Sequence, residues 1–442
     1  MKIIIIIIFS ISIFIIYSDN CINLDNNYKC INNDQYAYSD SWDERCFQTP
    51  PKNDIYGRYK QSFQDMHYLV GYAQLKYSSD GKRCTITFIT KVNPILGIEN
   101  EDYKILYKFG EKEQESNNIF TTTSDVSYPE GMPISAEIYD MENNHLVQLI
   151  LENEYFIWDH PNINLPENIY EKGQKGVIVE LYGWPYNDIA EECEFLGHSG
   201  YMGVKVMPPN ESILTYRNTF NGQLNPLDYI FESVSYKLES RMGNKQQLNN
   251  MINKCRQHGV RVYAEIVINH MCSNGNDLYE KHVNNDCTTW GAVDGSAGSP
   301  FWTMKGLNKK NSYTNLPPVF EFPAVPYFAS DFHCYGKQHL NYGWVYDLVD
   351  LNSEKEYVQQ RIVDFLTELI SIGFSGFDIN SGCFLFPKHY AAIFKKLKLN
   401  LGKEELPNDF IAYLQLDMWE DWHKRVYICE RENEYNFASN FT

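Results

Sequence analysis

Between residues 20 and 164, the apolar positions follow the short pattern of β-strands. Residues 68–75, 84–89 and 146–151 are rich in β-branched and aromatic side chains, and turn residues such as 79–81 separate the runs. No long stretch with a helical period interrupts them. The pattern therefore predicts a mostly β, sandwich-like N-terminal domain over residues 20–164.

After a polar, proline-containing join near residues 161–176, strands and helices alternate. Apolar runs typical of buried strands occur at 177–182, 203–207, 260–268, 374–379 and 410–416. Amphipathic helices are predicted at 187–195, before Gly259 and before Gly373. Such alternation predicts a parallel sheet with outer helices, and hence an α/β domain over residues 176–442.

The start of the chain has the pattern of a targeting segment. Lys2 precedes an apolar run from Ile3 to Ile16, after which the chain turns polar. This indicates a cleaved signal peptide of residues 1–18 and a secreted protein. A membrane anchor is the alternative, but a spanning helix needs about 20 apolar residues.

Charge and cysteine content narrow the possible partners. The net charge of −19 argues against nucleic acid and against an anionic membrane surface, because both would repel the chain. In an oxidising compartment most of the 11 cysteines should form disulfides. Because their number is odd, at least one is expected to be free or linked to another chain. No cysteine or histidine spacing typical of zinc sites occurs, so metal binding through cysteine is not expected.

Several motifs in one order identify a family. Residues 260–271, ending in Asn269-His270, resemble the third-strand signature of the alpha-amylase family. Residues 179–194 resemble the first strand and helix of its animal-type members. Further matches follow at 205–211, 234–238 and 322–327. The resemblance extends over residues 176–430, and residues 20–164 have no part in it.

The resemblance implies a (β/α)8 TIM-barrel-type domain with its active site at the C-terminal ends of the strands. The implied mechanism is retaining, and it needs a carboxylate nucleophile and a carboxylic acid about 5–5.5 Å apart. The family also has a third carboxylate on strand seven. The chain reaches Thr442 before such a motif, so we expect the barrel to be incomplete at the C-terminus.

Both catalytic positions implied by the resemblance are substituted. Asn380 stands at the position of the nucleophile, and Asp378 replaces the arginine two residues before it. Leu414 falls at the position of the general acid. An amide is not a usable nucleophile at carbon. Alternatives are that Asp378 is a relocated nucleophile, or that Asp417 or Glu420 serves as a shifted acid.

Substitutions also affect the implied metal site. Asn269 is the equivalent of a calcium ligand, but the other two ligand positions fall near Asn341/Tyr342 and at Phe384. We therefore expect no cofactor and loss of the family's calcium site. The resemblance also implies a disulfide between Cys193 and Cys255.

Substrate contacts are implied at the strand ends. The paired tryptophans of animal amylases align with Leu227 and Asp228, so Trp184, Tyr186 and His270 are the substrate-binding candidates. Their expected partner is an α-glucan or oligosaccharide. The sequence thus predicts a secreted, catalytically inactive alpha-amylase-like protein that is at most a weak glucan binder. Two alternatives stay open: an active hydrolase with non-standard residues, and a structural or surface protein without a ligand.

Overall fold

The computed structural model describes residues 21–22, 29–30, 69–92, 103–116, 119–125, 132–154, 176–215, 225, 227–272, 293–299, 301–303, 320–322, 324–327, 331–333, 348–401 and 410–414. The predicted signal peptide and the predicted domain boundary at 164–176 lie outside these residues, except for Gly176 itself, so both stay predictions. None of the helices in the described part is long and apolar enough to cross a membrane. In a separate unit formed by Met1–Ser41, strand β1 (Cys21–Ile22) pairs antiparallel with β2 (Lys29–Cys30).

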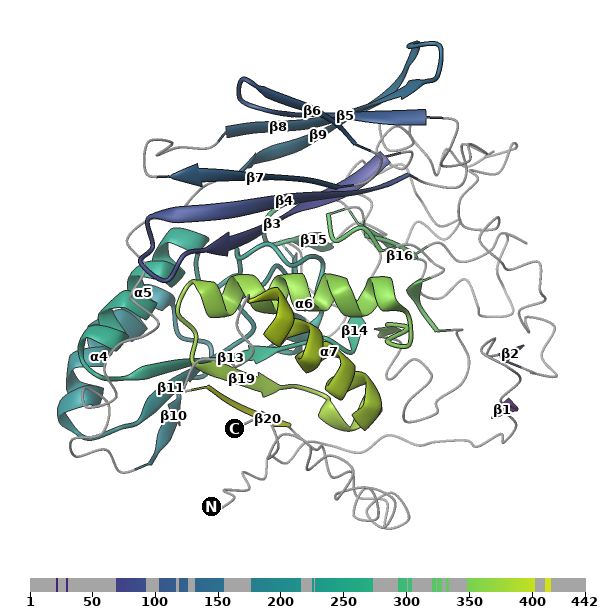
Figure 1. The fold of residues 1–442 in the computed structure, drawn as a ribbon. Helices are drawn as coiled ribbons and strands as arrows, with labels where there is room; N and C mark the ends of the chain where they lie inside the picture. The colour runs from purple at the N-terminus through teal and green to yellow at the C-terminus, as the bar shows by residue number, and fades with distance from the viewer. Residues whose placement is uncertain are drawn as a thin grey trace. The chain divides into compact units, whose positions relative to one another are not determined.

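Five parallel strands form the sheet that carries the candidate site (Figure 1). They are β10 (Ile178–Glu180), β11 (Gly203–Val206), β13 (Arg261–Ile266), β19 (Gly376–Ile379) and β20 (Ile411–Leu414). Each strand pairs with the next one in chain order. This is the strand order of a TIM-type barrel. All five strands lie within segments predicted from apolar runs, so these predictions are confirmed.

Helices fill the connections between these strands. They are α4 (Tyr186–His198), α5 (Lys245–Gln257), α6 (Glu356–Ser371) and α7 (Pro387–Asn400). The Asn244 side chain accepts from the Gln247 amide and the Gln247 side chain accepts from the Asn244 amide, a capping box that starts α5. At the start of β19, a Cβ at Gly376 would lie 1.7 Å from the Ile411 carbonyl oxygen, so the close pairing of β19 with β20 requires glycine.

The β-rich part consists of two antiparallel sheets. One contains β3 (Leu69–Tyr77), β4 (Arg83–Val92) and β7 (Ile119–Asp125). The other contains β6 (Lys112–Ser116), β5 (Tyr103–Phe109), β8 (Met132–Asp140) and β9 (His145–Glu154). Phe88 and Phe109 pack across the two sheets with ring centroids 5.9 Å apart. The predicted strands are therefore present, and two sheets with a shared core agree with a sandwich.

Strand β3 covers charged groups on helix α6. The Tyr72 hydroxyl donates to Asp364 Oδ2 at 2.5 Å, and the Arg361 guanidinium lies 3.8 Å from the Tyr72 ring centroid. Arg361 and Asp364 are both buried. Buried charges are tolerated when they are paired and hydrogen-bonded, so these contacts join α6 to the β-rich part.

Short elements complete the described structure. They are β12 (Ile213–Thr215), β14 (His270–Met271), β15 (Val293–Gly295), β16 (Trp302–Thr303), β17 (Phe320–Glu321), β18 (Val349–Asp350), and the 3-10 helices η3 (Leu227–Phe231) and η5 (Gly382–Phe384). Strand β14 pairs antiparallel with β18, so that His270 lies opposite Asp350. This pairing brings the chain before α6 against the end of the third barrel strand.

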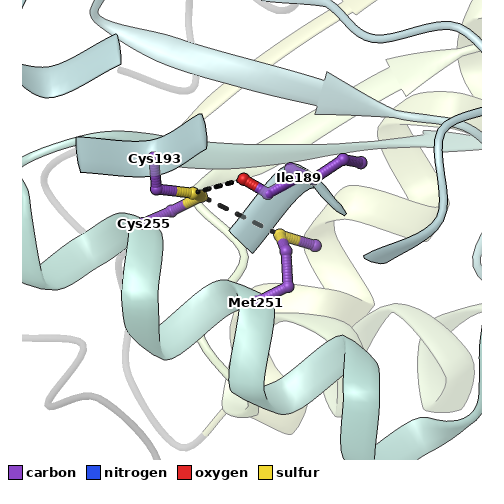
Figure 2. Close-up of a disulfide and its surroundings, with 4 residues drawn as sticks. All are labelled: Ile189, Cys193, Met251 and Cys255. Atoms are coloured by element: carbon purple, nitrogen blue, oxygen red, sulfur yellow. Dashed lines mark hydrogen bonds between the residues drawn. A yellow bond between two sulfur atoms is a disulfide. The ribbon is translucent and has the colours of Figure 1, made fainter. Parts of the chain in front are cut away.

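A disulfide joins helices α4 and α5 (Figure 2). Cys193 of α4 is bonded to Cys255 of α5, 62 residues further along the chain, as the resemblance implied. The Cys193 sulfur lies 3.1 Å from the Ile189 carbonyl oxygen, and the Cys255 sulfur lies 3.9 Å from the Met251 sulfur. Both cysteines are fully buried, so the bond is protected from solvent thiols.

Removing the disulfide should lower stability without changing the fold. Closing a loop of this length contributes about 4 kcal/mol in the chain-entropy model, so Cys193→Ser should shift the urea midpoint downward. Peptide mapping under non-reducing conditions should recover the two cysteine peptides as one species. A free thiol at either position in most molecules would contradict the pairing.

Candidate active site at the strand ends

Asn380, the residue at the implied nucleophile position, follows directly after β19. Its backbone N–H donates to the Ile266 carbonyl at 3.0 Å, which extends the pairing with β13. Its side-chain Nδ2 donates to Glu265 Oε1 at 3.0 Å, and its Oδ1 accepts from the Ser381 hydroxyl at 2.8 Å. Both ends of the amide are therefore engaged within the protein.

A buried cluster of charged side chains lies beside this amide. Lys205 Nζ is 2.7 Å from Asp378 Oδ2, 2.9 Å from Glu180 Oε1 and 3.5 Å from Glu265 Oε2. The four side chains come from four neighbouring strands, β10, β11, β13 and β19. Glu180 is the register partner of Lys205, and Glu265 is the register partner of Asp378. Inward-pointing positions of adjacent barrel strands thus bring them together.

One ammonium faces three carboxylates in this cluster. Burial lowers the pKa of Lys205, but Glu265 and Asp378 outweigh burial and raise it above its usual value. Burial raises the pKa of Glu265 to about 7, since the opposing effects of Lys205 and the Asn380 amide are smaller. Near neutral pH, Glu265 therefore takes up a proton readily, which reduces the excess negative charge.

At the described strand ends, neither Asn380 nor Asp378 is a free nucleophile. Asp378, the alternative considered from sequence, is 2% exposed and bound to Lys205. Leu414 is the last residue of β20 and pairs with Ile379, as expected for the end of strand five. Asp417 and Glu420 lie outside the described residues. The described strand ends thus carry an amide at the position aligned with the nucleophile, and an internally neutralised carboxylate two residues before it.

Two of the predicted substrate contacts need correction. Tyr186 is 1% exposed, and its hydroxyl is 3.0 Å from the Ser240 hydroxyl. His270 is 3% exposed, with Nε2 3.2 Å from the Phe231 carbonyl oxygen. Burial lowers the pKa of His270 to about 4, so its ring is neutral at pH 7. Neither ring is exposed enough to stack against a sugar.

Trp184 remains a candidate, and sequence reasoning missed a second aromatic residue. Trp184 is 40% exposed and Tyr182 is 41% exposed. Burial raises the pKa of the Tyr182 hydroxyl, and the charges of Glu265 and Glu180 add to this rise. Tyr182 lies two residues after Glu180, and this period of two along the strand was the signal that could have identified it. Leu227, at an implied stacking position, is also exposed.

Only part of the implied calcium site lies in the described residues. Asn269 is buried, and its carbonyl oxygen accepts from the Leu351 N–H at 2.9 Å. Phe384, at the implied histidine position, is a buried phenyl ring that cannot ligate a metal. Asn341 and Tyr342 lie outside the description. No group of three or more His, Cys, Asp or Glu side chains is placed for metal binding within the described ranges. The expected loss of the calcium site stays a prediction.

Comparison with known proteins points to one family. The sequence model of the alpha-amylase family, described as the alpha-amylase catalytic domain, matches residues 228–427. Pancreatic alpha-amylase of Sus scrofa is 36% identical over 245 residues, which is 52% of this chain and 41% of that protein. The family model and these relatives support membership of the alpha-amylase family. Alpha-amylase of Dermatophagoides pteronyssinus is 31% identical over 270 residues, 58% of this chain and 45% of that protein.

The chain thus spans less than half the length of these alpha-amylase relatives. Among solved structures, a mutant of alpha-amylase I from Eisenia fetida in complex with maltohexaose is 26% identical, with a TM-score of 0.45. That match covers 59% of this chain and 48% of the other.

Replacing the central amide should create a charge conflict. Asn380→Asp removes the donor to Glu265 and places a second carboxylate 3.0 Å from it. We expect a loss of about 1–3 kcal/mol of unfolding free energy. Repulsion raises the folded-state pKa of the carboxyl pair, so the loss should be small near pH 5 and larger near pH 8. Urea unfolding at both pH values measures this.

The control for this experiment is Asn250→Asp, the same change on the exposed face of α5. Its effect should be small at both pH values. Equal stability of Asn380→Asp and the parent protein at pH 8 would contradict the proximity of Asn380 to a charged Glu265.

Proposed function

We propose that this protein is a secreted, non-hydrolytic member of the alpha-amylase family that binds α-glucan weakly at the ends of its barrel strands. The single observation behind the absence of hydrolysis is Asn380, whose amide occupies the nucleophile position and is hydrogen-bonded to Glu265 and Ser381. A retaining mechanism forms a covalent bond between the nucleophile and the anomeric carbon, and an amide in this state cannot supply that bond.

The surrounding charges support the same proposal. Asp378 is tied to Lys205, so it is not available as a substitute nucleophile. The position aligned with the acid is Leu414, and general acid catalysis alone contributes about 10²–10⁴-fold to the rate. Catalytic groups that act as a unit are strongly non-additive, so a single repair recovers little. In Asn380→Asp, the new carboxylate would also face Glu265, whose Oε1 accepts from the Asn380 amide at 3.0 Å.

Secretion is supported by two independent features. The first is the charged and then apolar start of the chain, residues 1–16. The second is the buried Cys193–Cys255 disulfide, because structural disulfides form and persist mainly in oxidising compartments.

Weak glucan binding is supported by the exposed surface after the first strand. Tyr182 and Trp184 present aromatic rings there, and Leu227 adds an exposed apolar side chain on η3. Aromatic rings commonly contribute the largest share of burial at such contacts. With Leu227 and Asp228 at the stacking positions, we expect affinity in the millimolar range, about −4 kcal/mol. A structural protein without a ligand is the second candidate.

Binding without turnover is the expected result. The full-length protein should release no reducing sugar from soluble starch, and neither should Asn380→Asp. Affinity electrophoresis in starch gels should show slight retardation. Trp184→Ala and Tyr182→Ala should each lower the affinity for starch about fivefold to tenfold, as expected for loss of one aromatic contact.

Phe195→Ala is the matched control, because Phe195 is an exposed aromatic residue on the outer helix α4. It should leave retardation unchanged. Sugar release by the parent protein would refute the non-hydrolytic proposal. Absence of retardation and of calorimetric heat would instead favour the structural protein.

A further inference from the structure

Helix α6 carries two charged side chains on the face that β3 covers. Arg361 and Asp364 are three residues apart, so they project from the same side of the helix. They are only 6% and 2% exposed. Charged side chains are almost never fully buried unless they are paired, because burial without hydrogen-bonding partners is costly. The cover over α6 must therefore supply such partners.

One side chain of β3 meets the needs of both charges. The Tyr72 hydroxyl donates to Asp364 Oδ2 at 2.5 Å, and the Tyr72 ring centroid lies 3.8 Å from the Arg361 guanidinium carbon. The hydroxyl replaces a water that the carboxylate loses on burial. The ring face attracts the guanidinium, and this cation–π attraction is strongest when the pair is desolvated.

The barrel supplies further partners for the same two side chains. Arg361 Nε donates to the Val325 carbonyl at 3.2 Å. Asp364 Oδ1 accepts from Gln360 Nε2 at 2.8 Å and from Asn400 Nδ2 at 3.3 Å. The contact with β3 therefore completes a polar network that begins within the barrel.

A second contact joins β3 to the end of helix α7. Lys76 lies on the same face of β3 as Tyr72, because side chains alternate along a strand. Its Nζ donates at 2.6 Å to the carbonyl of Asn400, the last residue of α7. The last carbonyls of a helix lack partners within the helix and carry partial negative charge, which favours an ammonium there. The Asn400 side chain also donates to Thr367 Oγ1 of α6 at 2.9 Å.

The opposite face of β3 packs into the β-rich part. Leu75 and Tyr77 are buried there, and they belong to a hydrophobic core that is continuous with the buried residues of the barrel. Domains that move relative to one another bury smaller and more polar interfaces. Strand β3 thus has one face in each part of the structure.

We propose that the β-rich part, strands β3 to β9, acts as a brace for the barrel: β3 supplies the partners of the buried charges on α6 and of the end of α7, and the two parts unfold as one cooperative unit. The β-rich part is then not an independently moving module. Because α6 leads into β19, the brace also fixes the helix before the strand that carries Asp378. This role is separate from glucan binding, which concerns the surface after the first barrel strand.

The full-length parent protein provides the first test. Hydrogen exchange followed by mass spectrometry at increasing urea reports where each segment loses its protection. Peptides from β3 and β4 and peptides from α6 should lose protection at the same urea concentration, within about 0.2 M. Loss of protection in β3 and β4 at a clearly lower urea concentration than in α6 would overturn the proposal.

Variants of the contact provide the second test. Tyr72→Phe keeps the ring over Arg361 but removes the donor to Asp364, so amide exchange in α6 should become about fivefold faster. Tyr139→Phe is the matched control, because its hydroxyl also donates to a carboxylate, that of Glu137 on the same strand β8. It should leave exchange in α6 unchanged. Equal exchange in α6 for the two variants would overturn the proposal.

A double variant shows whether the hydroxyl acts through Asp364. In an Asp364→Ala background the acceptor is absent, so adding Tyr72→Phe should change exchange in α6 by less than about twofold. A full fivefold increase in that background would contradict the assigned contact and overturn the proposal. If Tyr72→Phe does not fold, the urea series on the parent protein still decides whether the two parts unfold together.

Discussion

A single buried ammonium, that of Lys205, determines which charges the centre of this barrel can tolerate. It contacts carboxylates from three neighbouring strands, Glu180, Glu265 and Asp378. Removing ions from water costs several kcal/mol each, and only close pairing offsets that cost. The positions of Asp378 and Asn380 in the fourth strand follow from this constraint, since Asp378 is held by Lys205 and the Asn380 amide hydrogen-bonds to Glu265.

The same physical solution recurs after the end of the third barrel strand. On β19, the charge of Asp378 is balanced by Lys205 on β11. After β13, the buried carboxylate of Asp350 contacts a ring nitrogen of His333. At both places a buried carboxylate is paired with another side chain of this chain, as the cost of burying an unpaired charge requires.

Much of the barrel could be predicted from sequence, because its signals are local. Five apolar runs identified the parallel strands, and the Cys193–Cys255 disulfide followed from the family resemblance. The contacts of the site could not be predicted. Lys205 and Asp378 are 173 residues apart, and only the strand register brings them together. Tyr186 was expected at the surface because it follows a strand end, but it begins α4 and turns its hydroxyl toward Ser240.

The central claim is that Lys205 neutralises Asp378 within the barrel, and a double-mutant cycle on this pair tests it most directly. Lys205→Met should cost about 3–5 kcal/mol of unfolding free energy, because it leaves buried carboxylates without their cation. Asp378→Asn in the Lys205→Met background should recover part of that loss, which gives a coupling energy of about 1–3 kcal/mol from urea unfolding of the four proteins. Additive effects of the two substitutions would contradict the account.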